Sequence, residues 1–77
     1  MRVMVTRHAW QEWNRDQRRQ WSRAEIAKAV RPRLDRLLVE RRRDKWQVKV
    51  WADGGWMNAV VTPELDGWTV VTAWRVS

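Results

Sequence analysis

One histidine, His8, is the side chain of this 77-residue sequence best suited to carry a proton near neutral pH. It lies in the stretch VTRHAWQEW, between residues that alternate as in a strand and residues spaced as in a helix. Side chains at such junctions are positioned by rigid elements and stay accessible. Because tyrosine is absent, other proton chemistry would have to use lysine or carboxylate groups. The alternative is that His8 is an ordinary surface or capping residue.

Thr72 is the second candidate for chemistry, within the final apolar stretch WTVVTAWRV. Strict strand alternation puts Thr69 and Arg75 on one face and Thr72 on the other. Thr72 then shares its face with an apolar row, namely Trp68, Val70 and Trp74. Thr72 is therefore either a polar residue tolerated in a core row or one placed there for function. Threonine is also a common strand former, which is the simpler explanation.

Four of the five residues from 41 to 45 are cations: Arg41, Arg42, Arg43 and Lys45. Basic residues at the end of a helix complement its dipole, which explains part of this run. The dipole does not require four cations in five positions, and the excess predicts a phosphate-binding edge. Arg41 also continues the apolar stripe of the preceding helix. Either that helix ends before Arg41, or its side chain projects from the helix end toward the sheet.

Lys49 and Trp51 share one phase of the alternating stretch KWQVKVWAD. An ammonium group beside an indole can hold a phosphate and stack a base, which predicts nucleic-acid binding. Arg75 is a further candidate for a nucleic-acid contact. The alternative is that Trp51 belongs to a minor core and that Lys49 is a solvated strand residue.

The charge balance and residue types limit the class of protein. Sixteen lysines and arginines against nine acidic residues give a net charge of +7, which predicts a nucleic acid or an acidic protein as partner. No cysteine is present, and a single histidine disfavours a structural zinc site. Phosphate-binding loops, dinucleotide fingerprints and nucleophile elbows are absent, so we expect no cofactor and no metal. Without a long apolar run or a signal-peptide pattern, we expect a cytoplasmic protein with no membrane partner.

Two helices are predicted after a first strand at residues 2–6. The first helix covers about residues 8–21, with its tryptophans on one side. The second begins with a capping box formed by Ser22 and Glu25. Its apolar stripe continues in phase through Pro32, so the helix kinks there or a second segment restarts in register. The stripe consists of Ile26, Ala27, Val30, Leu34, Leu37 and Leu38.

The remaining residues predict an antiparallel meander of three strands, with turns at residues 53–55 and 63–67. In the second turn, Pro63 opens the turn and Gly67 can adopt a left-handed conformation. The sequence therefore predicts one α+β domain over residues 1–77, with two N-terminal helices packed on one face of a small twisted antiparallel sheet. The order is β-α-α-β-β-β, and the first strand joins an edge or lies beside the last strand. The other face stays free, and in a basic protein it is the natural place for RNA or DNA.

The stretches VTRHAW, WSRAEIAKAV and VKVWADGGWMNAVVTPELDGWTVVTAWR together resemble the RelE/ParE-like toxin superfamily and its barnase–EndoU–colicin–RelE relatives. The resemblance is greatest to short phage and prophage members, and it covers nearly the whole chain through short motifs. It implies a helix pair on a twisted antiparallel sheet and, in the ribonuclease branch, metal-independent RNA cleavage. His8 matches the N-terminal histidine, and Thr72 matches the threonine of the last strand. Arg41, Lys49 and Arg75 would then take phosphate-binding roles.

In the implied reaction, the 2′-hydroxyl attacks the adjacent phosphate while a base removes its proton and an acid protonates the 5′-oxygen. The chain departs from this pattern, since it has no tyrosine and too few histidines for a two-histidine pair. The gyrase-directed branch has the same fold without nuclease residues. One hypothesis is therefore an endoribonuclease toxin that acts on RNA, including ribosome-associated RNA, and is neutralised by an acidic antitoxin. The others are a non-catalytic module that binds nucleic acid or an acidic protein, and a structural protein with a tryptophan interface.

Overall fold

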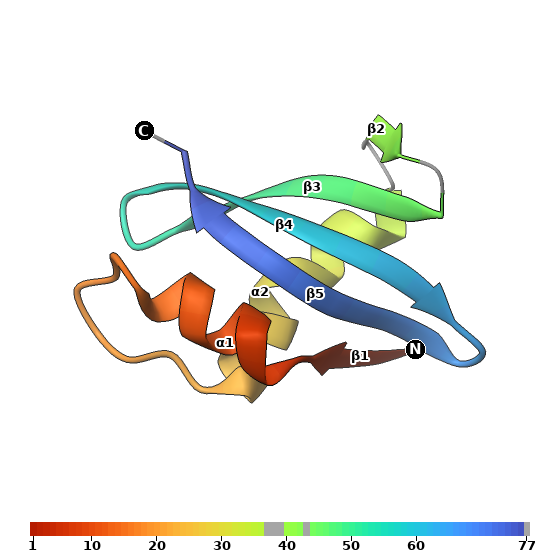
Figure 1. Ribbon diagram of the computed structural model, residues 1–77, viewed down its shortest axis with the longest axis horizontal. Coiled ribbons are helices and arrows are strands. Elements are labelled where there is room, and N and C mark those ends of the chain that lie inside the picture. The colour runs from red at the N-terminus through yellow and green to blue at the C-terminus, as the bar shows by residue number, and fades with distance from the viewer. Residues whose placement is uncertain (37–39, 43, 77) are drawn as a thin grey trace.

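The computed structural model describes residues 1–36, 40–42 and 44–76, with the backbone alone for residues 36 and 40–42. In this part of the chain, two helices pack on one face of a twisted five-stranded sheet (Figure 1). The elements are β1 (Arg2–Val5), α1 (Arg7–Asn14), α2 (Arg23–Arg36), β2 (Glu40–Arg42), β3 (Lys45–Ala52), β4 (Gly55–Glu64) and β5 (Gly67–Arg75). The predicted α+β class and the order β-α-α-β-β-β are confirmed, with the short strand β2 added before the meander.

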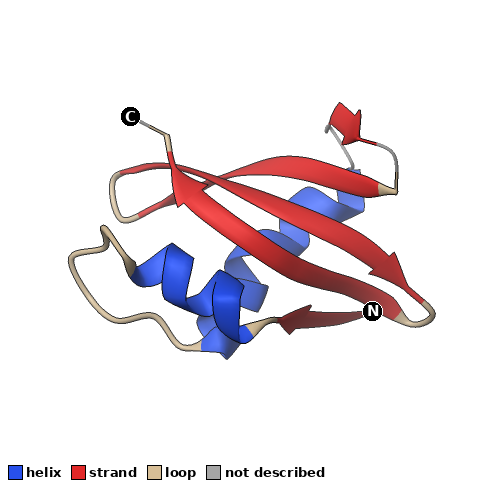
Figure 2. Ribbon diagram, viewed as in Figure 1, coloured by secondary structure: helices blue, strands red, loops and turns tan. Residues whose placement is uncertain are grey.

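The strands form one layer and the helices the other, and the core lies between them (Figure 2). α1 contributes Ala9 and Trp13, both fully buried. α2 contributes the predicted stripe as far as it is described: Ile26, Ala27, Val30 and Leu34. The strands contribute alternate residues, as a sheet with one covered face requires: Val5, Val48, Val50, Ala52, Met57, Ala59, Val61, Val70 and Ala73. Leu37 and Leu38 lie outside the described residues.

The strand order is β1-β5-β4-β3-β2, which confirms that the first strand lies at an edge beside the last one. The expectation of a purely antiparallel sheet is wrong, because β1 pairs with β5 in parallel. The reason is the crossover through α1 and α2, which leads to β2 and then, after the β2–β3 hairpin, to β3 in the direction of β1. Two hairpins later, β5 runs in that direction again.

The β4–β5 turn is tighter than predicted, because β4 continues through Pro63 to Glu64 and pairs there with Gly67. Gly67 does not adopt a left-handed conformation; in the described chain, Gly54 is the glycine with positive φ. Glycine is required at 67 for another reason. It lies opposite Arg2, and a Cβ at this position would collide with the carbonyl oxygen of Arg2. The close approach of β1 therefore explains the residue.

The first helix ends at Asn14, seven residues before its predicted end at Trp21. The Asn14 amide donates hydrogen bonds to the carbonyls of Trp10 (3.0 Å) and Trp21 (3.1 Å), and its Oδ1 accepts the Trp21 N–H at 2.7 Å. These bonds compete with helix continuation and fold the following loop back onto α1. Trp21 reaches the core from that loop, with its ring edge-on to Trp13 at a centroid distance of 5.4 Å.

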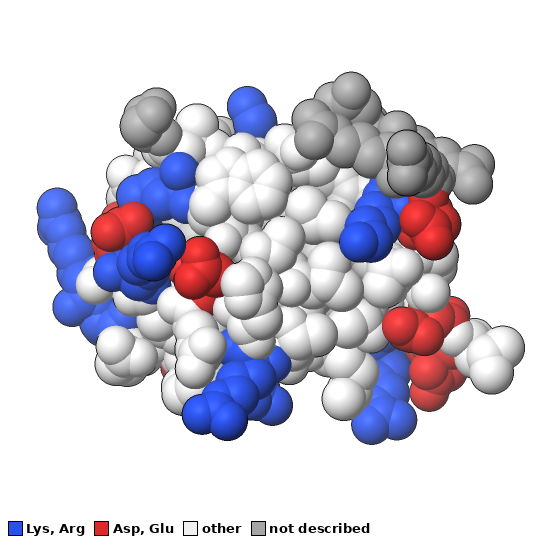
Figure 3. Space-filling view, viewed as in Figure 1, with Lys and Arg blue, Asp and Glu red and all other residues white. Residues whose placement is uncertain are grey.

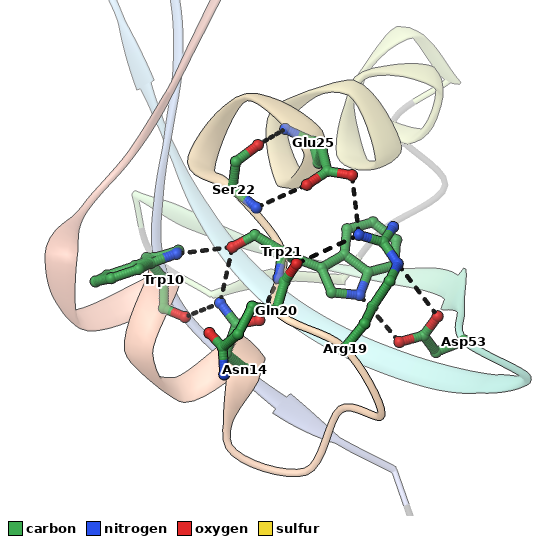
Figure 4. Close-up of polar contacts among 8 residues, drawn as sticks. All are labelled: Trp10, Asn14, Arg19, Gln20, Trp21, Ser22, Glu25 and Asp53. Atoms are coloured by element: carbon green, nitrogen blue, oxygen red, sulfur yellow. Dashed lines mark hydrogen bonds and ion pairs between the residues drawn. The ribbon is translucent and has the colours of Figure 1, made fainter.

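Arg19 and Trp21 connect the loop between α1 and α2 to the start of α2 and to the β3–β4 turn (Figure 4). The Trp21 indole donates to Asp53 Oδ2 at 3.0 Å, and the Arg19 guanidinium lies 4.0 Å from the centroid of the Trp21 ring. Arg19 also forms an ion pair with Glu25 at 2.9 Å. The network therefore joins the loop, the start of α2 and the β3–β4 turn.

The start of α2 follows the predicted capping box. The Glu25 N–H donates to Ser22 Oγ at 3.1 Å, and the Ser22 N–H donates to Glu25 Oε1 at 2.9 Å. α2 then continues as one helix through Pro32, although proline removes a backbone donor from the helix interior. This result rules out a second segment that restarts in register at Pro32.

Candidate nucleic-acid interface

The face of the sheet opposite the helices carries rows of side chains that cross β3, β4 and β5. Trp74 pairs with Asn58, which pairs with Lys49. The next row joins Trp56 to Trp51. The registers therefore place indoles on three neighbouring strands at the end of the sheet that holds the β3–β4 turn.

These indoles are exposed to solvent: Trp51 by 57 %, Trp56 by 41 % and Trp74 by 40 %. Trp51 and Trp56 contact each other edge-to-face, with ring centroids 5.2 Å apart and an interplanar angle of 79°. The guanidinium of Arg33, from α2, lies 5.7 Å from the centroid of Trp56. We refer to Trp51, Trp56 and Trp74 as the tryptophan platform.

Of the platform, Trp51 is a predicted binding residue, and Trp56 and Trp74 are not. Trp56 could have been found, because the two-residue turn at Asp53 and Gly54 pairs it with Trp51. Strand alternation predicts Trp74 in the core row, and a β-bulge explains why this prediction is wrong. Val60 pairs with Thr72 and Val61 with Val70, so Val71 is an additional residue in β5.

A one-residue bulge reverses which face each later side chain occupies. Thr72 and Trp74 therefore lie on the open face, and the predicted phase of Thr72 is wrong. Arg75 lies on the helix side, where its guanidinium donates to Gln17 Oε1 at 2.7 Å. It is half-buried there and does not join Lys49 and Trp51. No sequence signal marks the bulge.

His8 and Thr72 are brought together, with 3.2 Å between His8 Nε2 and Thr72 Oγ1. Thr6 explains this placement. Its hydroxyl accepts the Ala9 N–H at 3.0 Å as the N-cap of α1 and donates to the carbonyl of Val71 at 3.3 Å. The start of α1 is thereby fixed to the bulge in β5, and His8, in the first helical turn, reaches Thr72. The pair is exposed to solvent.

The described members of the basic run belong to strands, with Arg41 and Arg42 in β2 and Lys45 at the start of β3. Arg41 and Arg42 belong to β2, where they pair with Trp46 and Lys45. Their side chains, and Arg43 altogether, lie outside the described residues. Lys45 and Lys49 are exposed. Viewed from the side of the sheet that α2 does not cover, lysines and arginines gather toward the periphery, and the middle of the face is uncharged (Figure 3).

Two polar side chains of the open face contain buried oxygens without a hydrogen-bond partner. Asn58, between Trp74 and Lys49, is 8 % exposed, and its Oδ1 is unpaired. Gln47, two residues before Lys49, has an unpaired Oε1. A buried polar group without a partner costs about 1–3 kcal/mol of stability.

Within the described residues, no three histidine, cysteine or carboxylate side chains come close enough to hold a metal ion. Among the helices of the described chain, none is long and apolar enough to span a bilayer. Comparison with protein-family models, curated proteins and solved structures finds no match to this chain.

Proposed function

We propose that the protein binds single-stranded RNA on the open face of its sheet. The observation that carries this proposal is the tryptophan platform, in which exposed indoles lie on β5, β4 and β3. Bases stack on aromatic side chains with little dependence on sequence, and neighbouring strands present such side chains at a spacing that successive bases can use.

Charge supports the same proposal. Lys49 lies in the row of Trp74, and Arg33 approaches Trp56, so cations border the platform on its β3 side. The net charge of +7 attracts a polyanion. The uncharged middle of the face suits stacked bases, and the lysines and arginines toward its periphery, which lie among some carboxylates, suit phosphates.

The experiment is RNA binding measured by fluorescence anisotropy with an end-labelled single strand of about twelve nucleotides. Trp56→Ala and Trp74→Ala should each weaken binding about 5- to 150-fold, the range for one lost stacking contact. Leu65→Ala is the matched control, because Leu65 is fully exposed at the opposite hairpin turn. Unchanged affinity in both tryptophan variants would overturn the proposal. A DNA strand of the same sequence tests the preference for RNA.

RNA cleavage is the second candidate function, favoured by the contact between His8 and Thr72. In this reaction His8 Nε2 takes the 2′-hydroxyl proton, the 2′-oxygen bonds to phosphorus, and the bond to the 5′-oxygen breaks while a water molecule gives that oxygen a proton. The products are a 2′,3′-cyclic phosphate and a 5′-hydroxyl. Cleavage ranks second because, within the described residues, neither side chain of this pair forms an ion pair or hydrogen bond with a carboxylate or a cation.

Cleavage is tested with radiolabelled RNA in EDTA, which removes metal-dependent nucleases. Cyclic phosphate ends that disappear in His8→Ala and fall in Thr72→Val would support the assignment. Binding without cyclic ends would leave the protein as an RNA-binding module. The resemblance to RelE/ParE-like toxins, the cytoplasmic location and the acidic antitoxin remain predictions, and RNA as ligand agrees with each of them.

A further inference from the structure

The outer edge of β1 has no neighbouring strand in the described chain, because β1 lies at one end of the strand order and β2 at the other. Figure 1 shows β5 on one side of β1 and no strand on the other. None of the undescribed residues adjoins β1 in the sequence. Residues 37–39 and 43 flank β2, at the opposite edge of the sheet, and residue 77 follows Val76, whose N–H donates to the carbonyl of Trp56 on β4.

The parallel pairing with β5 determines which backbone groups of β1 face outward. The Arg2 N–H donates to the carbonyl of Asp66 at 2.9 Å, which fixes Arg2 as a residue that bonds toward β5. Backbone groups of successive residues point to opposite sides of a strand, so those of Met4 also face β5 and those of Val3 and Val5 face away. In the described chain, no hydrogen bond outside the sheet occupies these outward groups. Unpaired groups on a strand edge are the template onto which another strand adds.

A groove lies beside this edge, between β1 and α2. Its volume is about 420 Å³, and it is lined by Val3, Ala24, Ala27, Lys28 and Arg31. The spacing of the four α2 residues places them on one face of the helix. The two alanines leave the groove open beside Val3, and the two exposed cations border it. Side chains of an added strand alternate in direction, so every second one would lie over this groove.

The charges beside the edge favour one kind of occupant. The ion pairs of the described residues use Arg15 and Arg19, so Lys28 and Arg31 have no carboxylate partner within that part of the chain. A second copy of this chain would bring the same two cations from both molecules to one interface, and each copy carries a net charge of +7. An acidic segment would instead place carboxylates beside both cations.

We propose that the outer edge of β1 binds an extended acidic segment of another protein as an additional strand. The backbone of the segment pairs with Val3 and Val5. Its acidic side chains lie over the groove, where their methylene groups contact the two alanines and their carboxylates bond to Lys28 and Arg31. The intervening apolar side chains lie beside Met4, which is 45 % exposed on the open face.

This edge is separate from the tryptophan platform. β1 pairs with β5 only over Gly67–Val70, whereas the platform lies at the end of the sheet that holds the β3–β4 turn. A nucleic acid also lacks the alternating backbone donors and acceptors that a strand edge pairs with. The inference therefore does not depend on RNA binding.

The test is hydrogen exchange of single amides, followed by NMR, with the full chain and a capped peptide of about seven residues that alternates glutamate and valine. In the free protein the amides of Val3 and Val5, here called the edge amides, should exchange faster than the Met4 amide, which bonds to β5. Saturating peptide should slow exchange of the edge amides by at least about tenfold. Binding that leaves the edge amides in fast exchange would overturn the proposal.

The contribution of charge is tested by exchanging it on each partner. A peptide with lysine in place of glutamate should bind at least about tenfold more weakly than the glutamate peptide. The double variant Lys28→Glu/Arg31→Glu changes two exposed helix positions and should reverse this preference. Arg15→Glu/Arg18→Glu is the matched control, because it changes the net charge equally at exposed positions beyond the groove lining. Equal loss of glutamate-peptide binding in both double variants would overturn the proposal.

Two further measurements identify other occupants of the edge. Dimerisation of the chain without peptide that slows the edge amides would assign the edge to a second copy and overturn the proposal. RNA that slows them would assign the edge to nucleic acid, with the same consequence. RNA that binds the tryptophan platform and leaves the edge amides unchanged would support two separate sites. Should Lys28→Glu/Arg31→Glu fail to fold, the two peptides on the parent chain still decide the question.

Discussion

On the helix side of the sheet, Trp13 contacts Trp21 with ring centroids 5.4 Å apart. On the open face, Trp51 contacts Trp56 with ring centroids 5.2 Å apart. Both contacts are edge-to-face, yet their surroundings differ. Trp13 is fully buried, and Trp21 donates its indole N–H to Asp53. Trp51 and Trp56 expose about half of their surface to solvent.

The difference shows that burial, and not the geometry of the ring contact, determines whether an aromatic pair stabilises the fold or is available to a ligand. On the helix side, the removal of a ring opens a cavity and lowers stability. On the open face, a ring already in contact with water has little folding free energy to lose, and its apolar surface remains available to a ligand. Variants that affect stability and ligand binding separately therefore test this division.

The largest expected effect is that of Trp13→Ala. Loss of this fully buried ring should lower the free energy of unfolding by about 3–5 kcal/mol, a large share of the total for a small domain. Trp74→Ala should lower it by about 1 kcal/mol or less. Chemical denaturation followed by circular dichroism measures both. Equal losses would contradict the division between the two sides.

Pro32 is an exception on the helix side, because it lies inside α2 at an exposed position. Pro32→Ala should restore a helical hydrogen bond and raise the free energy of unfolding by about 1–3 kcal/mol. The same denaturation experiment measures the gain, with Ala29→Gly as a control for a destabilising change in the same helix. A loss of stability would show that the proline ring is required for packing.

The outline of the fold could be predicted because local signals determine it. The Ser22–Glu25 capping box, the stripe from Ile26 to Leu34 and the alternation in β3 each depend on residues close in sequence. The end of α1 could not be predicted, because it depends on bonds between Asn14 and Trp21. Helical spacing through residue 21 gave the wrong answer because tertiary contacts override periodicity.

The candidate site was less predictable than the fold. His8 and Thr72 were proposed together and do contact each other, but the strand phase used for Thr72 was wrong. The additional residue at Val71 reverses the rest of β5, which takes Arg75 to the helix side and brings Trp74 to the open face. A bulge arises from pairing between strands and has no marker in the sequence of one strand.

A smaller effect is expected at Trp21, where the network of Figure 4 can be reduced by one bond. Trp21→Phe keeps an aromatic edge near Trp13 and removes the indole N–H that binds Asp53. The loss of this bond should lower the free energy of unfolding by about 1 kcal/mol. Trp51→Phe is the matched change on the open face and should have a smaller effect. If the open-face variant proved the more destabilising, Trp51 would belong to the folding core.

The smallest effect concerns Glu25 and depends on pH. The hydrogen bond from the Ser22 backbone N–H, followed by the contacts with Arg19, lowers the pKa of Glu25 below its usual 4.5. A carboxylate whose pKa is lower in the folded state stabilises the fold above its unfolded pKa, and this contribution disappears as the pH falls through the folded pKa. Glu25→Gln should therefore be less stable than the parent near neutral pH, and the two should converge in acid below 4.5. Denaturation midpoints at a series of pH values measure this convergence. Because Glu25 is exposed, added salt should reduce the difference in stability between the parent and Glu25→Gln. If that difference persisted unchanged in acid, the neutral hydrogen bonds of the cap would be its cause, and not the charge of Glu25.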